Sequence, residues 1–205
     1  MLRPSTFSRA ATAIFLLASV SGTAAPMTKS EFRAGMRKLW EDHVTWTRIY
    51  IVDAAADLPS KSVTADRLLR NQSDIGGAIK PFYGEAAGDK LTALLKDHIL
   101  IAAELIDAAK TGQAAKKEAA AKKWEANADE IAAFLSGANP QNWPATEMRK
   151  HMHDHLDLTT AEVTARLTKD WDADIAAYDK IHEQILQMAD MLSSGIIKQH
   201  ADKFA

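Results

Sequence analysis

The sequence predicts an all-α protein: a helical bundle of about six helices, built from repeated helical hairpins. Ala, Leu, Lys, Glu and Gln dominate the chain, and the alternating β-branched runs typical of strands do not occur. Apolar residues recur at steps of three and four over long stretches, as they do on the buried face of a helix. Short elements also repeat along the chain, which indicates that one structural unit recurs.

Residues 1–25 have the three zones of a secretory signal peptide. Two arginines precede the apolar run Ala10–Val20, and small residues follow it up to Ala25. The run is too short for a stable membrane anchor, and no later stretch has the ~18 uninterrupted apolar residues of a membrane span. We therefore expect export to the periplasm or the extracellular space, with residues 26–205 forming one all-helical domain.

Glycine or proline follows each of the first four predicted helices and ends it. These helices are expected at about Lys29–Leu58, Thr64–Tyr83, Asp89–Lys110 and Ala114–Ser136. The chain is helical again from Thr146 to about His200, and we expect a break at Thr159–Glu162, which has the pattern of a capping box. The hairpins are then about 29–84, 88–138 and 145–200, giving a four-helix-bundle core plus a C-terminal helical pair.

Composition excludes several classes of function. The chain has no cysteine, which rules out disulfides, thiolate metal sites and a cysteine nucleophile. Its 25 basic residues are matched by 27 acidic ones, so there is no basic excess for binding nucleic acid. Neither a Gly-x-Ser-x-Gly turn nor a Gly-rich phosphate loop after a strand is present, and a non-enzymatic role is favoured. A deep pocket lined by Arg48, Asp74 and His43 would favour a hydrolase or transferase that uses histidine and aspartate as acid and base.

An internal repeat is the most informative feature of the sequence. Asp-His followed by an aliphatic residue occurs three times, at His43, His98 and His155. The pattern Asn-x-x-acid-Ile-small occurs at Asn71 and at Asn127, which follow the first two histidines by 28 and 29 residues. This spacing allows the chain to climb a helix, turn and return to the same level. Each asparagine should therefore face its histidine across a hairpin, with His182 as a weaker match in the third copy.

These residue types predict a metal or small-cofactor site in the bundle core. Residues three apart share a helix face, so each asparagine should present the following acid beside the histidines. Mixed imidazole, amide and carboxylate ligands suit Fe, Zn, Cu or Ni. The candidate ligands are His43, Asn71, Asp74, His98, Asn127, Glu130 and His155.

A structural role is the alternative. A buried imidazole that hydrogen-bonds a facing asparagine satisfies both groups and fixes helix register without a metal. The protein would then be a non-catalytic structural or interaction protein of the cell envelope, and an envelope partner or a homo-oligomer stays open. The second histidine cluster, around His151 and His153, is expected to be a solvated segment. Asp170 and Asp174 are expected on a solvated stripe beside Trp171, and Gly76-Gly77 at a close helix contact.

Three stretches of the sequence are similar to a group of small, mostly exported bacterial helical proteins of uncharacterised function. They are residues 38–48, residues 68–72 and residues 127–132. The resemblance covers most of the mature chain and implies a helical bundle of the same extent. It carries over no catalytic or binding residues.

Overall fold

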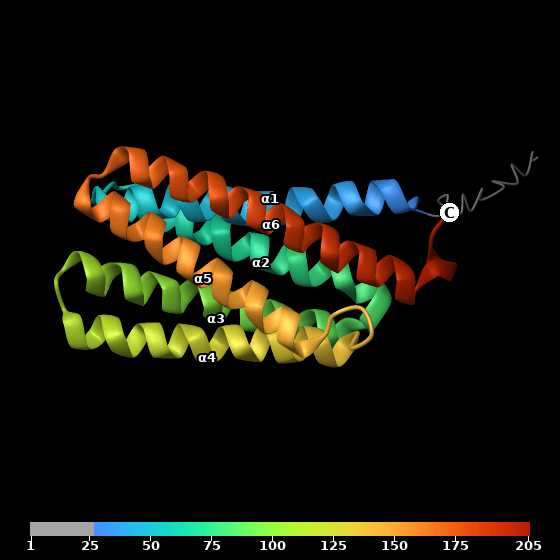
Figure 1. Ribbon diagram of the computed structural model, residues 1–205. Coiled ribbons are helices and arrows are strands. Elements are labelled where there is room, and N and C mark those ends of the chain that lie inside the picture. The colour runs from blue at the N-terminus through green and yellow to red at the C-terminus, as the bar shows by residue number, and fades with distance from the viewer. Residues whose placement is uncertain (1–26) are drawn as a thin grey trace, which may run out of the picture.

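The computed structural model describes residues 27–205, so the predicted signal peptide lies outside the described residues. This part of the chain is entirely helical, with six α-helices followed by one short 3-10 turn (Figure 1). The helices are α1 (Lys29–Ala55), α2 (Lys61–Tyr83), α3 (Glu85–Lys110), α4 (Ala114–Ala138), α5 (Ala145–Thr168) and α6 (Trp171–Gln199). The predicted fold class is confirmed.

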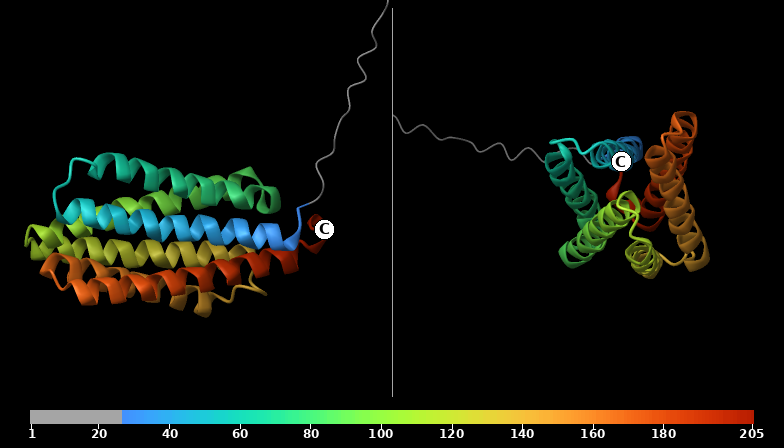
Figure 2. Two further views of the ribbon diagram at one scale, coloured as in Figure 1. Left: turned by 90° about the horizontal axis from the view of Figure 1, so that it is seen from above. Right: turned by 90° about the vertical axis from the view of Figure 1, so that its left-hand side faces the viewer.

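The six helices form a closed ring of three hairpins. Each helix packs against the next along the chain, and α6 packs against α1 to close the ring (Figure 2). α1 also contacts α3 and α5. The C-terminal pair α5–α6 is thus the third side of the ring, packed against both α4 and α1. Both ends of the described chain meet at one end of the bundle, where the Ala205 amide donates to the Met27 carbonyl.

The predicted break at Thr159–Glu162 is wrong, because α5 runs through it to Thr168. Thr159 donates its hydroxyl to the His155 carbonyl one turn back within the helix. Glu162 is buried and accepts a hydrogen bond from Arg48 on α1 at 2.7 Å. Thr159 is therefore engaged within α5 and Glu162 with α1, and neither side chain caps a helix. The chain reverses instead at Lys169, which has a left-handed φ of 63°, and Asp170 caps α6.

Asp174 was expected on a solvated stripe, and this prediction is wrong. Its carboxylate is buried and receives hydrogen bonds from Arg48 on α1 and Arg166 on α5. Burial opposes ionisation, but the two guanidinium groups outweigh it and hold the pKa of Asp174 below its ordinary value. Burial raises the pKa of Glu162, which shares Arg48 with Asp174. This ion cluster ties α1, α5 and α6 together near one end of the ring.

The predicted close contact at Gly76-Gly77 involves only the first of the two glycines. Gly76 on α2 faces Gly88 on α3, and a Cβ on Gly76 would lie 2.5 Å from the Gly88 carbonyl oxygen and 2.0 Å from the Thr92 hydroxyl. A Cβ on Gly77 would meet nothing within 4 Å. The two helices therefore approach at a point where only glycine fits.

We expect Gly76→Ala to lower the free energy of unfolding by about 1–3 kcal/mol, because the added methyl must push two backbones apart. Gly77→Ala is the matched control and should raise stability by ~0.5–1 kcal/mol through helix propensity alone. Urea unfolding followed by circular dichroism measures both. Equal effects of the two substitutions would contradict the close crossing of α2 and α3.

Candidate functional site

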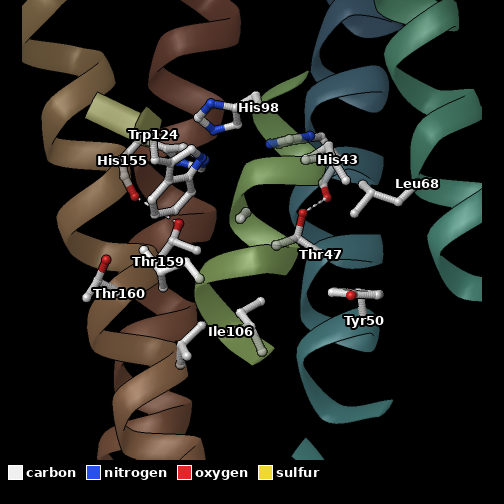
Figure 3. Close-up of a pocket in the computed structure, with 14 residues that line it drawn as sticks. His43, Thr47, Tyr50, Leu68, His98, Ile106, Trp124, His155, Thr159 and Thr160 are labelled. Atoms are coloured by element: carbon white, nitrogen blue, oxygen red, sulfur yellow. Dashed lines mark hydrogen bonds between the residues drawn. The ribbon is translucent and has the colours of Figure 1, made fainter. Parts of the chain in front are cut away.

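Three histidines from three hairpins meet in the interior of the ring. His43 comes from α1, His98 from α3 and His155 from α5, and each is only 3–4% exposed. The ring centroid of His155 lies 5.7 Å from that of His43 and 6.2 Å from that of His98. Figure 3 shows the three side chains at one level of the bundle, with Tyr50 and Ile106 further along it. We call His43, His98 and His155 the histidine cluster.

An amide side chain on the following helix holds the Nδ1 atom of each imidazole. Asn127 Oδ1 lies 2.8 Å from Nδ1 of His98, and Gln184 Oε1 lies 3.3 Å from Nδ1 of His155. An amide oxygen can only accept, so both imidazoles donate from Nδ1 and carry a lone pair on Nε2. Gln72 provides the corresponding contact to His43 at 3.3 Å. In all three hairpins the amide follows its histidine by 29 residues.

The same level of each hairpin carries a second hydrogen bond between its two helices. Asn127 Nδ2 donates to the Leu94 carbonyl, and Gln184 Nε2 donates to the His151 carbonyl. Both carbonyls belong to the residue four positions before the histidine. In the first hairpin two adjacent residues make these contacts. Gln72 contacts the imidazole, and Asn71 donates to the equivalent Leu39 carbonyl. In each hairpin one amide side chain therefore binds the backbone of the histidine helix near the level of the imidazole.

The first hairpin differs from the other two in the direction of its hydrogen bond. Gln72 presents Nε2 to Nδ1 of His43 and also donates to the Leu68 carbonyl and to Asn71 Oδ1. Its Oε1 atom is buried and has no partner. With this amide orientation Nδ1 of His43 accepts, so the proton of His43 is on Nε2. Rotating the amide would give His43 the tautomer of the other two histidines and Oε1 a partner. It would also turn Oε1 toward the Leu68 carbonyl and Asn71 Oδ1, the two acceptors of the present Nε2 group.

A small enclosed cavity adjoins the histidine cluster. The space open to the centre of a water molecule is about 20 Å³, which suffices for one water-sized species. All three histidines line it, together with Thr47, Thr159 and apolar side chains. Each Nδ1 faces the second helix of its own hairpin (α2, α4 or α6), so Nε2 faces away from that helix, toward the interior. Within residues 27–205 no hydrogen bond engages any of the three Nε2 atoms.

Two tryptophans flank the histidine cluster. The indole ring of Trp124 lies 5.1 Å from the imidazole of His98, and that of Trp40 lies 5.9 Å from His43. Both indole nitrogens are buried without a hydrogen-bond partner. These rings separate the cluster from solvent and surround it with aromatic surface.

Burial keeps the histidine cluster uncharged. It lowers the pKa of His98 to about 3 and that of His155 to about 4, and the pKa of His43 also falls well below its ordinary value. Repulsion between the imidazolium forms adds to this effect for His43 and His98. All three rings are therefore neutral at physiological pH, which is the form of imidazole that can bind a metal ion.

The structure brings together five of the seven residues predicted as ligands. His43, His98 and His155 form the cluster, and Asn71 and Asn127 are buried at its level. Asp74 and Glu130 are exposed on the outside of α2 and α4, away from the cluster. The buried stripe on these helices continues from each asparagine at steps of one, four and five residues. The acid at step three falls outside this stripe, so the expectation that it turns toward the histidines is wrong.

Sequence reasoning missed two amide partners, Gln72 and Gln184. A constant offset of 29 residues from each histidine would have found both. The weaker match considered for the third copy, His182, lies at the surface and contacts Glu41 at 2.9 Å. His153 contacts Asp129 at 2.8 Å at a partly exposed position, apart from the cluster. Arg48 and Asp74 do not line the cavity beside His43, so the pocket that would favour a hydrolase or transferase is not formed there.

Within residues 27–205 no three histidine or acidic side chains stand in the geometry of an assembled metal site. In the same part of the chain, none of the helices combines the length and the apolar character needed to cross a membrane. Comparison with known proteins finds no matching family model, no similar curated protein and no similar solved structure.

The depressed pKa values predict that acid destabilises the metal-free protein. An unfolded histidine titrates near 6.5, whereas burial lowers the pKa of folded His98 to about 3 and that of folded His155 to about 4, so the unfolded chain binds more protons in this range. Stability should therefore be full above pH 6.5 and fall as pH drops toward 4. Each buried histidine contributes up to ~1.4 kcal/mol per pH unit.

Urea unfolding across this pH range, in the presence of a chelator, measures the effect. His98→Gln should reduce the slope of stability against pH by about one proton. His153→Gln, which removes a partly exposed histidine outside the cluster, is the control. A slope that is the same in all three proteins would show that His98 is not held neutral.

Proposed function

We propose that this protein binds one transition-metal ion at the centre of the bundle, through the Nε2 atoms of His43, His98 and His155. One observation carries the proposal: three neutral imidazoles, one from each hairpin, border the same small cavity with Nδ1 already engaged. Within residues 27–205 none of the three Nε2 atoms has a hydrogen-bond partner, and all three rings line one cavity, which favours a single shared ligand.

The amide partners support this proposal. A histidine that binds a metal through one ring nitrogen almost always donates its other N–H group to an acceptor of the protein, which fixes the tautomer and the ring orientation. Asn127 and Gln184 accept from Nδ1 in this way. Gln72 differs, because it presents Nε2 to His43, and metal binding through Nε2 of His43 requires the Nδ1–H tautomer of that ring and a reoriented Gln72 amide.

The separation of the rings is close to what one ion requires. Three imidazole nitrogens bound about 2.0–2.1 Å from an ion place neighbouring ring centroids roughly 5 to 5.5 Å apart. The ring centroid of His155 lies 5.7 Å from that of His43 and 6.2 Å from that of His98, so the rings would have to move closer together to share one ion.

Iron, zinc, copper and nickel are the ions that imidazole ligands accommodate. The sequence of residues 1–25 supports export, so we propose that the ion is bound in the periplasm or the extracellular space. Asp74 and Glu130 are not part of this proposal, because both are exposed.

A structural role is the second candidate. The hydrogen bonds that join the two helices of each hairpin at the level of the histidines favour it. Asn127 and Gln184 each contact the imidazole and the backbone of the facing helix at one level, which fixes the register of the hairpin. Under this hypothesis the interior holds no metal. Replacing His98 and Asn127 together by leucine would then cost little stability, whereas replacing one alone would cost about 1–3 kcal/mol.

Metal content decides between the two candidates. Protein purified without an affinity tag should carry or take up one transition-metal ion per chain, measured by mass spectrometry of the elements. His98→Leu should abolish stoichiometric uptake, and Asn127→Leu should weaken the affinity by about 10- to 100-fold, as the loss of an orienting partner does.

His153→Gln is the control, because it removes a histidine outside the cluster and should leave uptake unchanged. Circular dichroism establishes that each variant is folded. The metal proposal is wrong if no ion binds stoichiometrically, or if folded His98→Leu protein binds it as well as the wild type does.

A further inference from the structure

We infer that the ion held by the histidine cluster is monovalent copper, Cu(I), in preference to a divalent ion. The inference rests on the proposed function and deepens it by naming the charge of the ion. It follows from the absence of any negative charge among the residues that line the cavity and hold the imidazoles.

The ligand set and its immediate supports are uncharged. The cavity is lined only by histidine, threonine, tyrosine, tryptophan and aliphatic side chains, with no acidic or basic residue among them. The groups behind the imidazoles are the neutral amides of Gln72, Asn127 and Gln184. Where a carboxylate holds a metal-binding histidine, it shares its negative charge with the site, and here that contribution is missing.

Acidic residues stand next to all three histidines in the sequence, yet none reaches the cavity. Asp97 is exposed, Asp42 pairs with Lys38, and Asp154 pairs with Lys150. Adjacent residues on an α-helix point about 100° apart, so an aspartate directly before an inward histidine faces outward. The charge of a bound ion therefore stays uncompensated by the protein interior.

An apolar interior that offers no compensating negative charge favours the ion with the smaller charge. The cost of moving an ion out of water rises with the square of its charge, so a divalent ion costs about four times as much as a monovalent one of equal size. The three histidines are 3–4% exposed, and two buried tryptophans flank them, so little water screens the ion.

The number of available ligands points to the same ion. Cu(I) has a filled d shell and is stable with only three ligands, whereas octahedral ions need six. The cavity offers about 20 Å³ to the centres of water molecules, enough for one additional ligand and not for three. Among the ions that imidazole accommodates, zinc with one bound water is then the main competitor, and it carries the larger charge.

Competition with chromophoric chelators tests the inference on the full exported chain. The metal-free protein is titrated with Cu(I) under nitrogen with a reductant present, and separately with Zn²⁺. We expect one Cu(I) per chain and an affinity at least ~100-fold higher than for Zn²⁺. Zn²⁺ binding as tight as Cu(I) would overturn this inference and leave the proposed function standing. Failure of Cu(I) to bind would also overturn this inference, and failure of Zn²⁺, Fe²⁺ and Ni²⁺ to bind as well would overturn the proposed function.

A charge variant tests the physical basis. Asn127→Asp places a carboxylate behind His98 at nearly unchanged size, and we expect it to raise the Zn²⁺ affinity by at least ~10-fold more than the Cu(I) affinity. It should also lower the reduction potential of bound copper, because added negative charge favours Cu(II). Asp97→Asn changes an exposed carboxylate next to the same histidine, and it should alter neither quantity. An unchanged affinity ratio in folded Asn127→Asp protein would contradict the charge argument.

Discussion

A hydrogen bond between an amide side chain and an imidazole, repeated in each hairpin, fixes the level at which the helices of this bundle meet. Apolar packing alone allows antiparallel helices to slide, because leucine, isoleucine and alanine fit many registers. A buried amide and a buried imidazole fit only where they face each other, since any slip leaves both without a partner at a cost of ~1–3 kcal/mol per group. The amides of Asn127 and Gln184 also bind a backbone carbonyl of the histidine helix, which specifies the register twice.

The amide–imidazole hydrogen bonds of the three hairpins lie at one level and form a polar layer between two apolar clusters. On α1 and α5 the residues packed on one side of this layer, such as Trp40 and Met152, belong to one apolar cluster, and those on the other side, such as Ile51 and Val163, belong to a second. Because the ring of helices is closed, the three imidazoles lie inside it. The same contacts that fix the register therefore also gather the histidines.

The fold was largely predictable because helix periodicity and helix ends are local properties. Gly84, Gly112 and Pro59 mark the turns in the sequence as they do in the structure. The break expected at Thr159–Glu162 was wrong because Glu162 pairs with an arginine more than a hundred residues away, which no local pattern reveals. Asp174 was misplaced for the same reason, since its burial depends on Arg48 and Arg166 from other helices.

The candidate site was predictable as far as the repeat reached. His43, His98 and His155 stand out because the same tripeptide pattern marks all three, and their convergence follows from equal hairpin lengths. Gln72 and Gln184 were missed because the amide changes type between copies, so that only the offset is constant. Asp74 and Glu130 were included because residues three apart share a helix face in isolation. In the ring, α2 and α4 each pack against both neighbouring helices. Their buried stripe leaves out the position three residues after the asparagine, so these two acids lie in solvent.

The most direct test of this account is an anomalous-diffraction map from crystals of the copper-loaded protein. The account predicts one strong peak per chain, about 2 Å from Nε2 of each histidine in the cluster and enclosed between α1, α3 and α5. A peak at the surface beside His151 and His153, with none in the interior, would contradict it.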